Sequence, residues 1–135
     1  MRKLTTIEQA NADVLGDAAL FHVTGTILNK NIQDCNAAIR DLLKREGVID
    51  YAELEPGDKV TLEGVYSDGT ETTISAYRAK TRGDKRIWFN SLKNHAEAGD
   101  IMALVIRGGK LVIQNVTKGV AVAVFAIPAL DTMVQ

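Results

Sequence analysis

The sequence predicts a mainly β fold with one or two helices, in the α+β class, built as a small closed or nearly closed barrel of about seven strands. Three observations lead to this prediction. Runs rich in β-branched and aromatic residues have the length of strands, they recur at short and even spacing, and glycine-containing turns separate them. With 135 residues and 46% apolar content, the chain fits one domain with a buried core.

The N-terminal part divides at about residue 20. Residues 1–20 are polar with an alanine-rich stretch, which indicates a short helix or a loosely docked arm. Residues 21–135 are expected to form the barrel domain. Its first strand is predicted at 21–28, where β-branched residues are frequent.

One helix is predicted after residue 31. Asn29 and Asn31 offer capping side chains, Lys44 and Arg45 suit the last turn, and Gly47 is a typical stop. Apolar residues between these signals recur at spacings of three and four, which makes one buried helical stripe: Ile32, Cys35, Ile39, Leu42 and Leu43.

The remainder is predicted to be strands and turns. Turns are expected at 67–69, 82–84 and 107–110, and a single helical turn at 91–97. The apolar run 120–130 is too short for a helix that spans a bilayer, which needs roughly 20 residues. The predicted strands are 59–66, 70–80, 86–90, 101–106, 111–116 and 120–130.

The sequence offers no convincing catalytic or metal-binding signature, and we expect no cofactor and no enzymatic activity. His22 and His95 lie far apart, and His95, in the basic region, is expected to be exposed. Cys35 lies on the apolar stripe, as a structural thiol does. A single cysteine and a start without an apolar leader indicate a cytoplasmic protein without membrane association. Five polar residues resemble the acid and lysine set of a nuclease, but their spacing does not match that of such a motif: Asp50, Glu53, Glu55, Asp58 and Lys59.

Positive charge is concentrated in residues 76–94, called here the basic stretch. It contains six basic residues and one acidic residue, so its net charge is +5, while the whole chain carries −1. Arg78 and Lys80 are expected to alternate along one strand face. Nucleic acid requires cations for its phosphates and Arg, Asn or aromatic side chains for its bases, and all of these occur here. Trp88 itself is expected in the core, and a solvated hairpin is the competing interpretation of the whole stretch.

A second candidate surface is the predicted helix start. Backbone N–H groups at a helix N-terminus attract anions, and the amides of Gln33 and Asn36 could read base edges. Arg40 adds a charge to the same face. Ordinary capping and a polar helix face explain the same residues.

The segment YRAKTRGDKRIWF, followed by AGDIMALVIRGGKLVI, resembles the DNA-binding pseudobarrel domains. These include the N-terminal effector domain of the EcoRII restriction enzyme and the related plant transcription-factor domains. The resemblance lies in the layout: a basic strand, a charged turn that ends at Arg86, then a Gly-Asp step into a closing hairpin. It implies a small pseudobarrel of about seven strands that grips the DNA major groove with two arms.

The resemblance places one arm at Asn29, Lys30 and Asn31. It places the other arm at Arg78, Lys80, Arg82, Lys85, Arg86 and Asn90, and Lys93 is expected to contact phosphate. We therefore expect a sequence-specific, non-catalytic module for duplex DNA, either a restriction–modification effector or a stand-alone regulator. The alternative is a structural or protein-interaction barrel of a phage or mobile element, whose basic face meets an acidic partner chain. The oligomeric state is left open, including a homodimer, and a small nuclease is a third alternative.

Overall fold

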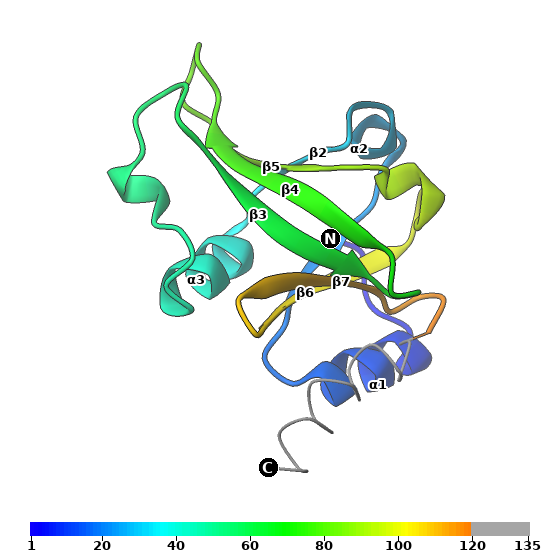
Figure 1. Ribbon diagram of the computed structural model, residues 1–135. Helices are drawn as coiled ribbons and strands as arrows, with labels where there is room; N and C mark the ends of the chain where they lie inside the picture. The colour runs from blue at the N-terminus through cyan, green and yellow to red at the C-terminus, as the bar shows by residue number, and fades with distance from the viewer. Residues whose placement is uncertain (120–135) are drawn as a thin grey trace.

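The computed structural model describes residues 1–119, and the predicted strand 120–130 lies outside them. The described residues form a curled seven-stranded sheet with three α-helices, so the predicted fold class is confirmed (Figure 1). Neighbouring strands are antiparallel except β3 and β7, which are parallel. The strand order across the sheet is β1 (Ala19–His22), β6 (Ile101–Arg107), β7 (Lys110–Asn115), β3 (Lys59–Tyr66), β4 (Glu71–Arg78), β5 (Lys85–Phe89) and β2 (Ile32–Asp34).

Two contacts show how far the sheet curls. Phe21 of β1 and Phe89 of β5 lie far apart in the strand order, yet their rings stack with centroids 5.5 Å apart. Asn36, just after the edge strand β2, donates a hydrogen bond of 3.0 Å to the carbonyl of Leu20 in β1, the opposite edge strand. The two edges therefore approach each other around one buried core. Helix α3 (Ala37–Arg45) contributes Ile39, Leu42 and Leu43 to this core.

A second, smaller core lies on the other face of β6 and β7. Helix α1 (Thr6–Leu15) covers that face, and its Ala12 and Leu15 pack with Ile101, Val105 and Val112. The helix begins at Thr6 because Thr5 and Glu8 form a capping box, in which each side chain bonds the other residue's backbone N–H. Residues 1–20 thus contain the short helix that was one of the two expectations.

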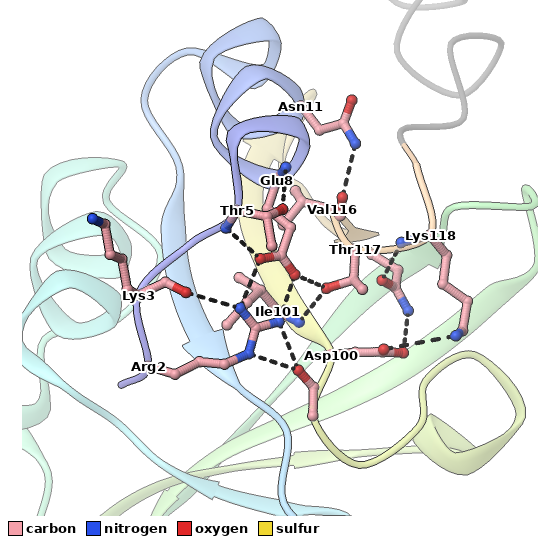
Figure 2. A network of polar contacts seen from close by, with 12 residues as sticks. Arg2, Lys3, Thr5, Glu8, Asn11, Asp100, Ile101, Val116, Thr117 and Lys118 are labelled. Atoms are coloured by element: carbon pink, nitrogen blue, oxygen red, sulfur yellow. Dashed lines mark hydrogen bonds and ion pairs between the residues drawn. The ribbon is translucent and has the colours of Figure 1, made fainter.

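The Glu8 carboxylate also joins the N-terminus to the ends of β6 and β7 (Figure 2). Glu8 is only 2% exposed and accepts hydrogen bonds from the Arg2 guanidinium and the Thr117 hydroxyl. Arg2 also donates to the carbonyl of Gly99 at 2.8 Å, and Thr117 accepts from the N–H of Ile101 at 2.8 Å. These bonds satisfy a buried charge, which would otherwise destabilise the fold.

The structure corrects two predicted elements between residues 21 and 36. The first strand ends at His22, and residues 25–28 belong to helix α2 (Gly25–Lys30), because the Thr24 side chain caps the N–H of Ile27. The helix predicted from Ile32 begins only at Ala37, where the Asn36 side chain accepts from the N–H of Ile39. Residues 32–34 form strand β2 instead.

The other predicted elements are found close to their expected bounds. Strand β3 matches 59–66, and β4 to β7 differ from the predicted bounds by one or two residues. Between β5 and β6, the helical turn expected within 91–97 is the 3-10 helix η2 (Leu92–Asn94). A further 3-10 helix, η1 (Tyr51–Glu53), was not predicted.

The Glu8 contacts lead to a prediction for stability. Hydrogen bonds from Arg2, Thr117 and the Thr5 N–H, together with the Arg2 charge, outweigh burial and hold the pKa of Glu8 far below its usual range. Glu8→Gln should lower Tm at pH 7 by roughly 5–10 °C, because the Arg2 guanidinium and the Thr117 hydroxyl lose a charged acceptor. Thermal unfolding followed by circular dichroism measures the change, with exposed Glu46→Gln as the matched control.

The sign of the pH dependence follows from the same shift. A carboxylate with a depressed native pKa stabilises the fold above its unfolded pKa of about 4.3, and this contribution is lost as the pH falls further. The Tm difference between wild type and Glu8→Gln should therefore shrink below about pH 4. A difference that stays constant from pH 7 to pH 3 would contradict this assignment.

Candidate nucleic-acid interface

The pairing of β2 with β5 brings the two predicted arms to one edge of the sheet. The N–H of Phe89 donates to the carbonyl of Asn31 at 2.7 Å, and the N–H of Cys35 donates to the carbonyl of Lys85 at 2.9 Å. Helix α2 therefore lies at one end of β5 and the β4–β5 hairpin turn at the other, as Figure 1 shows. From Lys85 to Phe89 the strand spans about 14 Å, at roughly 3.4 Å per residue.

A groove of about 340 Å³ separates α2 from β2. Lys30 of the first predicted arm and Arg86 of the second both line it, so the fold joins the two arms at one surface. Because Asn31 and Cys35 bond β5, the backbone N–H and C=O groups of Ile32 and Asp34 face away from it, as alternation along a strand requires. The groove is lined by Thr24, Thr26, Ile27, Lys30, Ile32, Gln33, Asp34 and Arg86.

Arg86 is held by two carboxylates. Its Nε lies 3.0 Å from Asp34 Oδ1 and its Nη2 lies 2.9 Å from Asp84 Oδ2. Burial lowers the pKa of Arg86, but the hydrogen bonds that its guanidinium donates to Asp34 and Tyr77 and the charges of Asp34 and Asp84 raise it by more. The guanidinium is thus held at the groove wall with its Nε and Nη2 directed at carboxylates.

Arg78 has a structural position within the hairpin. Its guanidinium donates to the carbonyl of Leu54 at 2.7 Å and to the carbonyl of Gly83 at 2.9 Å. Gly83 has φ +71°, and a Cβ there would lie 2.5 Å from Arg78 Nη2, so the turn requires glycine. We expected Arg78 and Lys80 to alternate along one strand face, but β4 ends at Arg78 and Lys80 lies in the turn.

Five cations at the two ends of β5 point into solvent. Lys80, Arg82 and Lys85 surround the hairpin turn, and Lys30 ends α2. Lys93 belongs to η2, which packs beside α2. Within residues 1–119, the four lysines form no ion pair, and Arg82 is 78% exposed although its Nη2 lies 3.5 Å from Asp84. These five residues and the groove between them are called the basic edge below.

The asparagines of the predicted site lie in three different environments. Asn29 is exposed on α2. Asn31 ends that helix in the left-handed conformation, with φ 58°, and supports β5 through its carbonyl. Asn90 lines a separate hollow together with Glu63 and Glu71. Of these three asparagines, only Asn29 is both exposed and located at the basic edge.

The second candidate surface does not form as predicted, because α3 begins five residues later than expected. The Asn36 side chain is the N-cap of α3, as the capping interpretation required. Arg40 donates to the carbonyl of Cys35 at 2.6 Å, which is a contact within the fold. Gln33 does reach the basic edge, since it lines the groove beside α2.

The position of Trp88 differs from the one predicted from the sequence. It was expected in the core, but it is only half-buried and lies on the outer face of β5. Its neighbours Ile87 and Phe89 are 0% exposed, and successive side chains of a strand point to opposite faces. The alternation of Arg86 and Trp88 with Ile87 and Phe89 was the sequence signal for this orientation.

Two of the residues considered for catalysis, Asp50 and Asp58, have structural roles. The Asp50 side chain caps η1, and the Asp58 side chain closes the turn at Glu55. The described part of the chain contains no group of three or more His, Cys, Asp or Glu residues that could hold a metal ion. Burial raises the pKa of Cys35 to about 11, which disfavours the reactive thiolate.

The histidines do not form a site together. His95, which was expected to be exposed, stacks on Tyr66 with ring centroids 3.7 Å apart and has only 14% of its side chain exposed. His22 is half-buried in β1, near the opposite edge of the sheet from β2.

Comparison of the chain with protein-family models, curated proteins and solved structures gives no significant match. The resemblance to the DNA-binding pseudobarrels therefore stays a prediction. Among residues 1–119, no helix has the length and apolar character needed to cross a membrane.

The position of Arg78 leads to a prediction. Arg78→Met should loosen the hairpin turn, because the carbonyls of Leu54 and Gly83 lose their donor. Hydrogen exchange should accelerate at residues 79–84, and Lys80→Met serves as the control because Lys80 is exposed. Unchanged exchange at 79–84 in Arg78→Met would show that the arginine does not hold the turn.

Proposed function

We propose that this chain is a non-catalytic, sequence-specific module for duplex DNA and that it binds through the basic edge. The observation that carries the proposal is the placement of Lys30 and Lys93 at one end of β5 and of Lys80, Arg82 and Lys85 at the other. Four of these five cations have no ion-pair partner within the described residues, so their charge is free to meet phosphate.

The dimensions of the basic edge suit a duplex. Its two ends are separated by about 14 Å along β5, and the major groove of B-DNA is about 12 Å wide. Cations at both ends can therefore meet phosphates of the two strands that border one groove. Phosphate contacts supply affinity and orientation rather than sequence discrimination.

Base recognition requires side chains between the phosphate contacts. Asn29 and Arg82 are exposed at the two ends, and Arg86 and Gln33 line the groove between them. Arginine bonds guanine and amides bond adenine through two parallel hydrogen bonds. Asp34 and Asp84 hold the Arg86 guanidinium and would compete with DNA for its Nε and Nη2 donors. A restriction-enzyme effector or a stand-alone regulator would use such a module.

One observation favours a protein-interaction barrel as the second candidate. Ile7 and Val14 are 70% and 74% exposed on α1, and residues seven positions apart lie on the same helix face. This face could contact another chain. Light scattering after size exclusion tests it, because a stable oligomer that Ile7→Lys dissociates would support this candidate.

Binding should be measured by fluorescence anisotropy with a labelled 20-base-pair duplex between 50 and 200 mM salt. Five phosphate contacts predict a slope of log K against log salt of up to about −4.5. Lys30→Ala and Lys85→Ala, at opposite ends of the basic edge, should each reduce the slope by about 1.

The matched control is Lys44→Ala on α3, because Lys44 is 68% exposed but pairs with Asp50 and lies away from the basic edge. Its affinity for the duplex should equal that of the wild type. No binding at 50 mM salt, or an equal loss in Lys44→Ala, would overturn the proposal.

A further inference from the structure

A row of aromatic and cationic side chains crosses the outer face of β3, β4 and β5. Tyr77 of β4 lies opposite Lys59 on one side and opposite Arg86 on the other. Trp88 lies opposite Ser75, two residues from Tyr77 along β4, so the two aromatic side chains are diagonal neighbours. Both aromatics are half-buried. None of these residues faces the main core, because their strand neighbours Ile74, Ala76, Ile87 and Phe89 do.

A hollow of about 370 Å³ opens in this face, lined by Lys59, Ser75, Tyr77 and Trp88. The small Ser75 side chain leaves space beside the two aromatics. The volume falls within the roughly 300–1,000 Å³ typical of ligand sites. The lining holds two aromatic side chains, the hydroxyl groups of Ser75 and Tyr77, and one cation, and it contains no carboxylate.

We propose that this hollow binds an unpaired base of single-stranded nucleic acid. The base would stack on Trp88 and Tyr77, and Lys59 would contact the adjoining phosphate. Aromatic platforms with neighbouring cations bind single strands in this way, and they accept every base because each base has a π-face. This inference goes beyond duplex binding at the basic edge and adds a second nucleic-acid site on the neighbouring face.

Charge identifies the class of ligand. The hollow around Asn90 on the same sheet is lined by Glu63, Glu71 and Lys110 and would repel phosphate. Lys59 is the one charged residue that lines the hollow at Trp88, and it forms no ion pair within residues 1–119. A protein partner would instead favour an interface centre with little charge, whereas here Lys59 and Arg86 flank Tyr77 directly.

The hollow also lies beside the basic edge. Ile32 lies opposite Trp88 across the β2–β5 pair, and Ile32 lines the groove beside α2. Paired strands are about 4.8 Å apart, so Ile32 in the groove wall lies one strand spacing from Trp88. A strand that leaves a duplex bound at the basic edge can therefore reach the aromatic side chains.

Trp88 is the only tryptophan of the chain, so its intrinsic fluorescence reports directly on this hollow. We expect a twelve-residue oligo(dT) to quench the fluorescence with saturation in the wild type. Tyr77→Ala should weaken this binding by roughly 5- to 150-fold, because it removes one stacking ring. Tyr77→Phe keeps the ring and should stay within about twofold of the wild type. Thr73→Ala, an exposed change on the same strand, is the second control.

Absence of quenching at saturating oligo(dT), or equal affinity of Tyr77→Ala and Tyr77→Phe, would overturn the inference. Circular dichroism shows whether each variant is folded. If Tyr77→Ala is unfolded, the affinity of Tyr77→Phe for oligo(dT) still tests the inference, because it should stay within about twofold of the wild type. The duplex titration separates the two proposals. Quenching by oligo(dT) without duplex binding supports the aromatic site and refutes the basic edge, while duplex binding without quenching does the reverse.

Discussion

The pairing of the three-residue strand β2 with β5 is the contact on which the candidate interface depends. Two hydrogen bonds, from Phe89 to Asn31 and from Cys35 to Lys85, border this short ladder. The left-handed conformation of Asn31 ends α2 just before β2 begins. Without this pairing, α2 and the β4–β5 hairpin would have no common edge, and Lys30 and Arg86 would not line the same groove.

Curling of the sheet brings that edge into contact with the opposite one. The stacked rings of Phe21 and Phe89 and the hydrogen bond from Asn36 to Leu20 connect opposite edges of the sheet around one core. At the far end of the molecule, the buried Glu8 carboxylate ties α1 to the ends of β6 and β7. Both proposed sites lie on strands whose inner faces pack against the main core, which holds their side chains in place.

Local signals predicted most of the sheet, and tertiary contacts explain the failures. Strand β3 follows from a run with strand character between two glycine turns. Residues 32–36 were misassigned because Ile32 and Cys35 fit the helical spacing of Ile39, while pairing with β5 decided their conformation. The basic stretch was found from charge alone. However, Arg86 pairs with Asp34, 52 residues away, and Arg78 bonds Leu54, so sequence could not show which cations are free.

The central claim is that the basic edge contacts duplex DNA, and amide NMR of the ¹⁵N-labelled chain tests it most directly. Titration with an unlabelled duplex should shift the amides of residues 29–34, 79–86 and 91–94, and those of β6 and β7 should stay in place. Shifts confined to α1, β6 and β7, or no shifts at low salt, would contradict the account.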